Sequence, residues 1–299
     1  MAVKTTGDFE QAVANAGSVM GRTAGDWKDI EQVARQYGKT TTYTATESAG
    51  AIQLLAQYGY DLSDAQKMMA TTTKLATGQQ YDLGQTTDIV VSTLKNFEKQ
   101  GYSTAQVGDI LAQASNISSA SMEKFRYSMK YVSPVASALG ISLEDMVGQL
   151  SALYDAGMPA ETAGTALRMA YNRLLNPTKE ATSALKSYGI ATKDVNPQTN
   201  KMADIIDTLT KAGVKTNDVF TIFELRLPAM LAMMQKGGDA VRGYEKQLTT
   251  STGTVSKMYK TQMSTFNNQT KLLKSQLGSR NFYWTSSSSS TQTVNSRSK

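Results

Sequence analysis

Two serine and lysine pairs have a spacing that could support nucleophilic catalysis. Ser121 precedes Lys124, and Ser183 precedes Lys186, in the Ser-x-x-Lys pattern of penicillin-recognising serine enzymes. Such an enzyme also needs a Ser-Asp-Asn segment and a Lys-Thr-Gly segment to complete its site. Neither segment occurs in this chain. We therefore interpret each serine as a helix N-cap and each lysine as a solvated side chain.

A second short motif has the residue types of a phosphate-binding loop. Gly38, Lys39 and Thr40 fit its last three positions, but the loop also needs a glycine five residues before Gly38, where this chain has Val33. Without that glycine the backbone cannot form the nest of N–H groups that holds a phosphate. We interpret the motif as the C-terminal cap of a helix.

The adjacent carboxylates Glu144 and Asp145 do not form a catalytic pair. Neighbouring residues on a helix point about 100° apart, so the two side chains cannot flank one bond. We expect both in the first turn of a helix, where negative charge complements the helix dipole.

The chain contains neither histidine nor cysteine. Zinc hydrolases, Ser-His-Asp triads, Cys-His pairs and disulfides are therefore excluded. Catalysis by carboxylate, lysine or tyrosine groups stays open, but we predict no enzyme, no catalytic or metal-binding residue and no cofactor. The longest tightly apolar run, Leu227–Met234, has eight residues, whereas a membrane span needs roughly 20. We therefore predict no transmembrane segment.

Helical periodicity, together with regularly placed capping residues and glycines, predicts an all-α fold. Apolar residues recur at spacings of three and four, as at Ile52, Leu55 and Tyr58. Capping boxes are expected at Thr44-Ala-Thr-Glu47 and Ser103-Thr-Ala-Gln106, with further N-caps at Ser63, Asp82 and Ser142. Expected helices end at glycines, which are Gly38, Gly59, Gly78, Gly101, Gly140, Gly157 and Gly189. The pattern predicts consecutive short helical hairpins, with one small β-hairpin near 190–202 around Asn196-Pro197.

The C-terminal part of the chain has a different pattern of apolar residues. Apolar or near-apolar residues fall at 255, 259, 263, 266, 270, 273 and 277, a mean spacing of about 3.67 that predicts one long amphipathic helix. A serine-rich segment follows, for which we expect disorder. Three regions result: a helical core domain over 1–250, a long helix over 251–279 and a disordered tail over 280–299. Because the helical stripe stops abruptly, we expect a truncation or a frameshift.

Positive charge is concentrated in the same C-terminal part. Residues 1–200 hold 17 basic and 19 acidic side chains, whereas residues 201–299 hold 14 basic and 6 acidic ones. No acidic residue follows Glu245, and Lys257, Lys260, Lys271 and Lys274 lie along the predicted long helix. These lysines are candidate contacts to nucleic acid, an acidic partner or a lipid surface. The alternative is a solvated helix face followed by a frayed tail.

The segment AGMPAETAGTALR at 156–168 combines a helix start with small residues. Gly157 and Pro159 should turn the chain into a helix. Ala163, Gly164 and Ala166 should then allow a neighbouring helix to approach closely, and Gly164 is a candidate packing residue. Arg168 is the one long charged side chain of this turn, and we expect it to anchor the contact by a charge-assisted hydrogen bond.

Several segments, taken in order, are similar to phage tail tape measure proteins of the TP901 type. The strongest resemblance lies at 156–190, in Ala163-Gly-Thr-Ala-Leu-Arg168, Asn176-Pro-Thr-Lys179 and the glycine-isoleucine pair that ends at Ile190. Weaker matches are Phe9-Glu-Gln-Ala-Val13, Lys39-Thr-Thr-Thr-Tyr-Thr-Ala-Thr-Glu47, Lys130-Tyr-Val-Ser-Pro-Val-Ala136 and Leu227-Pro-Ala-Met-Leu-Ala232. The resemblance covers about residues 8–279. Members are usually much longer, so this chain would hold the family's conserved head and the start of an extended ruler region at 251–279.

The resemblance implies a structural role in assembling the tail of a phage or prophage. Such proteins lie in the tail tube lumen, after assembly in the host cytoplasm, and their length sets tail length. Implied partners are the tail tube protein, tail assembly chaperones and further copies of the chain, with weak nucleic-acid contact. The alternative function is a helical module that binds nucleic acid or a partner protein through the basic C-terminal segment.

Overall fold

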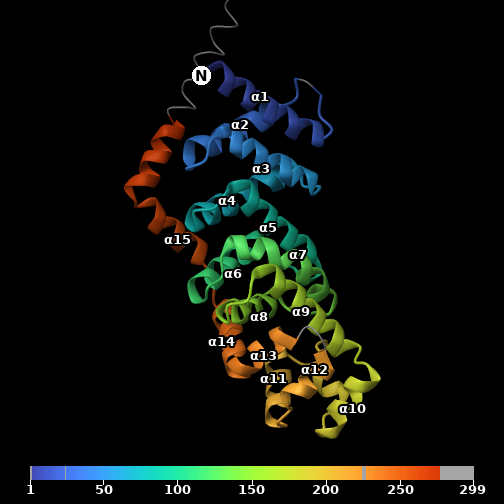
Figure 1. Ribbon diagram of the computed structural model, residues 1–299. Coiled ribbons are helices and arrows are strands. Elements are labelled where there is room, and N and C mark those ends of the chain that lie inside the picture. Colours follow the sequence, from blue (N-terminus) through green and yellow to red (C-terminus); the bar gives the residue numbers. More distant parts are fainter. Residues whose placement is uncertain (1, 24, 224–226, 277–299) are drawn as a thin grey trace, which may run out of the picture. The chain divides into compact units, whose positions relative to one another are not determined.

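The computed structural model describes residues 2–23, 25–223 and 227–276. Every regular element among these residues is a helix, which confirms the predicted all-α class (Figure 1). The chain forms two compact units. The first contains residues 1–91 and 256–299, and the second contains residues 92–255. The predicted domain boundaries at 250 and 279 stay predictions, and the predicted disordered tail over 280–299 lies outside the described residues.

The first unit is built around one central helix. Helix α3 packs against its chain neighbours α2 and α4 and also against α1, so this unit combines contacts between consecutive helices with one that skips a helix. Its buried residues are mostly alanines with Ile52 and Leu55. The elements are α1(Ala2–Val19), α2(Lys28–Thr40), α3(Ala45–Gln57), α4(Leu62–Gln79) and the beginning of α5(Leu83–Asn96).

The second unit is centred on α8, whose residues are almost all buried. Leu143 and every residue from Asp145 to Tyr154 are buried, because α6, α7, α9, α13 and α14 all pack on this helix. The remaining elements of this unit are η1(Glu98–Gln100), α6(Thr104–Ile117), α7(Met122–Ala138), α8(Leu143–Asp155), α9(Ala160–Leu175), α10(Lys179–Ser187), η2(Thr192–Val195), α11(Met202–Lys211), α12(Thr216–Phe223), α13(Leu227–Lys236), α14(Gly238–Thr249) and the first residues of α15(Thr254–Met263).

Local capping signals set most of the helix starts. Both capping boxes are present, with the side chains of Thr44 and Ser103 accepting hydrogen bonds from the N–H groups of Glu47 and Gln106. The predicted N-caps at Asp82 and Ser142 are confirmed by bonds from the N–H groups of Gln85 and Asp145. Ser63 is not an N-cap, because the carboxylate of Asp61 caps α4 two residues earlier.

Two predicted glycine caps are wrong for a shared reason. Most of the predicted glycines do have a left-handed backbone after a helix, as at Gly157 with φ 81°. Gly38 and Gly78 instead lie inside α2 and α4. A Cβ at Gly38 would stand 2.8 Å from the backbone nitrogen of Ala45, and one at Gly78 would stand 2.9 Å from Cγ of Met258. These glycines therefore permit close packing.

The predicted β-hairpin near 190–202 is wrong. Residues 192–195 form a short 3-10 helix, and α11 begins at Met202. The carboxylate of Asp194 accepts a hydrogen bond from the N–H of Ala191, and the Asn200 amide donates to the carbonyl of Lys193 at 2.7 Å. These local side-chain bonds satisfy the backbone groups that a strand partner would otherwise need.

The single long C-terminal helix is interrupted. Helix α15 ends at Met263, and a second helix is described over 266–276. At the break the hydroxyl groups of Ser264 and Thr265 donate to the carbonyls of Thr261 and Gln262, and the Asn268 amide donates to the Gln262 carbonyl. Side chains thus occupy the carbonyls that the next helical turn would have used, which ends the helix.

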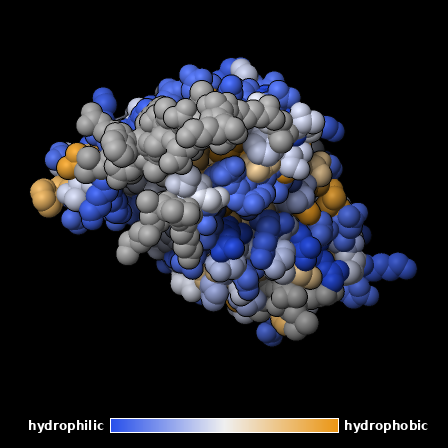
Figure 2. Space-filling model, turned by 90° about the horizontal axis from the view of Figure 1, so that it is seen from above, coloured by the Kyte–Doolittle hydropathy of each residue, from blue (hydrophilic) through white to orange (hydrophobic). Residues whose placement is uncertain are grey.

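The surface is largely polar. Figure 2 shows mostly hydrophilic residues on the face in view, with separate hydrophobic areas between them. Among the described residues, the large apolar side chains with high exposure are Val19, Phe220, Phe266 and Leu273. None of the described helices is both long enough and apolar enough to cross a membrane.

Candidate functional site

The small-residue segment forms a close helix crossing. Gly157 turns the chain and Pro159 precedes α9, as predicted, and the helix begins at Ala160. Gly164 is buried, and a Cβ placed on it would stand 2.3 Å from the carbonyl oxygen and 2.6 Å from Cα of Ser128. Real Cβ atoms do not approach backbone this closely, so the crossing of α9 with α7 requires glycine at 164.

The hydroxyl of Ser128 ties the same crossing to a third helix. It donates to the carbonyl of Lys124 at 3.0 Å and forms a hydrogen bond with the hydroxyl of Tyr154 on α8. Burial raises the pKa of the Tyr154 hydroxyl far above its ordinary value, so this group stays neutral. The ring of Tyr154 also meets Phe125 edge-on, with centroids 6.1 Å apart. The hydrogen bond and the ring contact thus join α7 to α8 beside the crossing with α9.

A second buried polar chain links α9 to α8. Tyr171 donates to Oε1 of Gln149 at 2.7 Å, and Nε2 of Gln149 donates to Oδ1 of Asp145 at 3.2 Å. Burial, with the nearby charge of Glu245, raises the pKa of Asp145 from 3.8 to about 6, while the Gln149 bond and the charge of Lys201 oppose the rise. The sequence placed Asp145 in a first turn, but it contains no signal that this carboxylate is enclosed.

The predicted anchor Arg168 lies on α9 near the crossing. Its Nε atom is enclosed, and it has no hydrogen-bond partner among the described residues. The side chain as a whole is partly exposed. The predicted charge-assisted anchoring role therefore stays a prediction.

The four predicted interaction lysines are all exposed. Lys257 and Lys260 lie on α15, whereas Lys271 and Lys274 lie on the 266–276 helix beyond the break. They are therefore spread over two helices rather than along one continuous face.

The motifs whose residue types suggested catalysis lie at helix starts or on exposed helix faces. The Ser121 hydroxyl caps α7 by accepting from the N–H of Lys124, and the Lys124 ammonium donates to the carbonyl of Ser119 at 2.6 Å. Ser183 and Lys186 are exposed on α10, but Thr178 is the N-cap of that helix, so the expected N-cap at Ser183 is wrong. Glu144 accepts a hydrogen bond from the hydroxyl of Tyr102. No group of three metal-binding side chains occurs within the described part of the chain.

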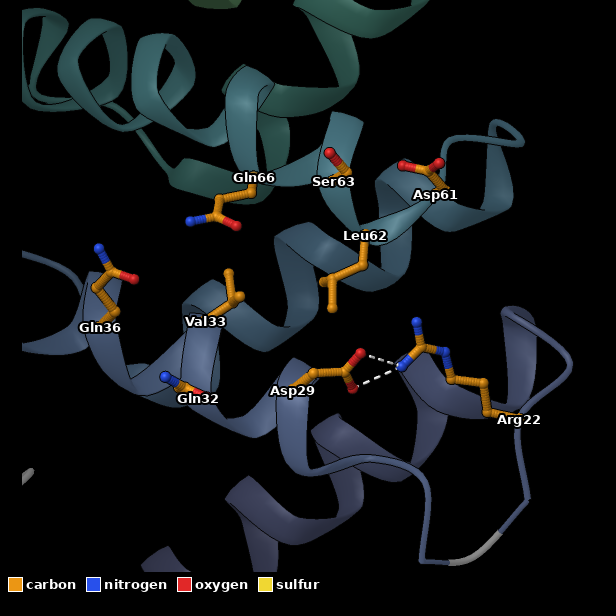
Figure 3. A pocket seen from close by; sticks show the side chains of 9 residues that line it. All are labelled: Arg22, Asp29, Gln32, Val33, Gln36, Asp61, Leu62, Ser63 and Gln66. Atoms are coloured by element: carbon orange, nitrogen blue, oxygen red, sulfur yellow. Dashed lines mark hydrogen bonds and ion pairs between the residues drawn. The ribbon is translucent and has the colours of Figure 1, made fainter.

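An open hollow of about 520 Å³ lies between α2 and α4 in the first unit (Figure 3). Its charged groups are already engaged. Arg22 pairs with Asp29, and the Asp61 carboxylate accepts the N–H of Asp64 at 2.8 Å. The other lining side chains are Gln32, Val33, Gln36, Leu62, Ser63 and Gln66. The hollow brings together amides and a hydroxyl, without a nucleophile beside a base.

The structure is that of an all-α protein in which helices cross closely at small residues. Buried polar side chains form hydrogen bonds between these helices. The family described as phage-related minor tail protein matches residues 31–223, which include the crossing and both polar chains. The chain belongs to this family.

Two curated relatives support the same placement. The chain is 28% identical over 157 residues to the tape measure protein of Pneumococcus phage Dp-1, and 32% identical over 96 residues to the probable tape measure protein of Escherichia phage P2. These alignments cover 50% and 32% of this chain, but only 14% and 12% of the relatives. The chain therefore matches a small part of much longer proteins. No solved structure shows significant similarity to it.

Proposed function

We propose that this chain acts as part of a tape measure protein, a structural component that lies in the tail tube lumen of a phage or prophage. In that position it would help to nucleate tube assembly and set tail length. The observation that carries the proposal is the family match over residues 31–223, together with two relatives that are both named as tape measure proteins. The finer assignment to the TP901 type belongs to the same proposal.

The character of the helix contacts supports this role. A protein enclosed in a narrow tube must pack its helices closely and allow them to separate on release. Crossings at small residues, such as Gly164 on Ser128, bring backbones together without a side chain between them. Since apolar burial contributes about 25 cal/mol per Å², a backbone contact of this kind adds little by itself to the free energy of unfolding.

The proposed partners follow from the role. They are the tail tube protein, the tail assembly chaperones and further copies of the chain in the lumen, with weak nucleic-acid contact during infection. Assembly would take place in the host cytoplasm. The exposed Lys257, Lys260, Lys271 and Lys274 are proposed contact residues for these partners, and Gly164 with Arg168 are proposed packing residues.

The alternative, a nucleic-acid-binding module, is not favoured. It rests on the basic C-terminal segment, whose lysines lie on two separate helices. The matched relatives are tail proteins. If the module existed, removal of residues 246–299 would abolish tight, salt-dependent DNA binding.

Electron microscopy of tails from a strain without this gene tests the proposal. We expect tails to be absent or irregular in length, and to be restored when the gene is supplied from a plasmid. Normal tails in the deletion strain would contradict the proposed role.

A further inference from the structure

The C-terminal helices turn back to pack on the ends of helices near the start of the chain (Figure 1). We call residues 256–276 the strap, which comprises most of α15 and the helix over 266–276. Met258 lies against Gly78, near the end of α4, so closely that a Cβ on this glycine would stand 2.9 Å from Cγ of Met258. The strap therefore packs directly on the backbone of α4.

Two polar contacts attach the strap beyond Met258. The side-chain amide of Gln80 donates to that of Gln262 at 2.8 Å. The hydroxyl of Ser275 lies within hydrogen-bonding distance of the carbonyl oxygen of Tyr43, at 2.9 Å, and of that of Gly38 near the end of α2. The strap thus covers the ends of α4 and α2, in the reverse of their order in the chain.

Little apolar surface holds the strap in place. Its buried residues are Asn268 and Ser275, which are both polar. The Asn268 amide donates within the strap itself, to the carbonyl of Gln262 at 2.9 Å. The larger apolar side chains of the strap, such as Met258 and Leu272, are partly buried or exposed. Since apolar burial is the main favourable term in helix packing, the strap is weakly attached.

The helices under the strap have a core of their own. Helices α1 to α4 pack on one another through α3, and Ile30, Ile52, Leu55 and Met69 are fully enclosed. The strap is added to this core from outside. Regions with few buried apolar contacts can open locally while the rest of a structure stays folded.

The residues directly before the strap are held more firmly. The Asp109 carboxylate accepts hydrogen bonds from the N–H groups of Gly253 at 2.7 Å and Val255 at 2.8 Å, and Val255 is buried. The strap can therefore pivot where it begins, and its opening should start at the Ser275 end.

We propose that the strap detaches from the first unit while α1 to α4 remain folded. Opening separates Ser275 from its two carbonyl partners and Met258 from Gly78, which uncovers the ends of α2 and α4. A freed strap would extend by up to about 30 Å as straight helix at ~1.5 Å per residue. For the proposed tape measure role, opening turns a folded-back segment into an extended one. It is measured on the purified chain, independently of tail length.

Pulsed electron paramagnetic resonance on the full chain tests the opening. Because the chain lacks cysteine, Thr40→Cys and Gln276→Cys can carry the two spin labels at exposed positions on α2 and at the end of the strap. We expect a short distance for the closed strap and a long, broad distribution for the open one. Ser275→Ala should raise the ratio of open to closed molecules roughly tenfold, the effect of one lost hydrogen bond.

Matched variants separate detachment from other effects. Ser256→Ala removes an exposed hydroxyl of α15 and should leave the ratio unchanged. Gly78→Ala should raise the ratio, because the new Cβ meets Met258, whereas Gly50→Ala on α3 adds a Cβ with no atom within 4 Å and should not. Hydrogen exchange over 45–57 should be the same in all variants, because α3 stays folded.

Three results would overturn the proposal. A short distance alone, in both the parent and the Ser275→Ala variant, would show that the strap is a fixed part of the unit. A long distance alone in the parent would show that the closed contacts do not form. Faster exchange over 45–57 whenever the strap opens would show that the first unit unfolds as a whole.

Discussion

Gly164 on α9 and Ser128 on α7 approach so closely that no side chain fits between them. A Cβ on Gly164 would stand 2.3 Å from the carbonyl oxygen of Ser128, a rigid backbone atom that cannot rotate away. The Ser128 hydroxyl meanwhile bonds Tyr154 on α8. Gly164 therefore sets how closely α9 can approach α7, at a residue that also binds α8.

Replacement of Gly164 by alanine should destabilise the second unit. The added methyl group forces α7 and α9 apart, and overpacking of this kind costs about 1–3 kcal/mol of unfolding free energy. Urea denaturation followed by circular dichroism measures the change.

Gly243→Ala is the matched control for that substitution. Gly243 lies inside α14 of the same unit, and a Cβ there would meet no atom within 4 Å. Alanine is the better helix former, so this variant should gain about 0.5–1 kcal/mol. Equal effects of the two substitutions would show that the crossing tolerates a side chain.

The buried carboxylate of Asp145 should make stability depend on pH. Its pKa rises from 3.8 to about 6 in the folded state, mainly through burial and also through the charge of Glu245. Between these values the folded protein holds a proton that the unfolded chain has released. Stability should therefore fall as pH rises from about 4 to 6.

Asp145→Asn should remove this dependence. The amide keeps an oxygen that can accept from Gln149, and it carries no charge to desolvate. The variant should be more stable than the parent above pH 6, by up to roughly 3 kcal/mol, and should match it near pH 4. Urea midpoints measured across this range test the point. Parallel pH profiles of the two proteins would contradict it.

Asp109 should hold the start of α15 in place. Its carboxylate accepts hydrogen bonds from the N–H groups of Gly253 at 2.7 Å and Val255 at 2.8 Å. Asp109→Ala leaves both donors without this acceptor and should cost about 1–3 kcal/mol. Asp109→Asn keeps one acceptor and should have an intermediate effect. Hydrogen exchange of the backbone amides over 254–263 should be faster in Asp109→Asn and fastest in Asp109→Ala. Unchanged exchange would show that Asp109 does not hold the start of α15.

Features set by neighbours in sequence were predictable. The capping boxes at Thr44 and Ser103 depend on residues three positions away, so their chemistry can be read directly. The turn at Gly157 and Pro159 and the start of α9 at Ala160 follow from similarly local preferences.

Features that depend on distant residues or on competing side chains could not be predicted from the sequence. The role of Gly38 depends on Ala45 beyond the turn, and the enclosure of Asp145 depends on helices far away in the chain. The break after Met263 arises because three side chains capture backbone carbonyls, which an apolar spacing does not reveal. A Cβ on Gly164 would meet the backbone of Ser128, a neighbour that the sequence could not identify.

The two compact units should unfold in more than one step. Each has its own buried helices, and many of the fully buried residues are alanines, which contribute little apolar area. Calorimetry should show overlapping transitions in the range of about 45–65 °C common to mesophile domains. A single sharp transition above about 80 °C would contradict this expectation.

Tail length is the most direct test of the proposed tape measure role. In-frame insertions of helical heptads after the codon for residue 276, introduced into the gene in its phage or prophage, change the length of the protein without altering the described helices. Tails measured by electron microscopy should lengthen in proportion to the insertion, by up to about 1.5 Å per added residue. A tail-length distribution that does not change with insertions of increasing size would contradict the role.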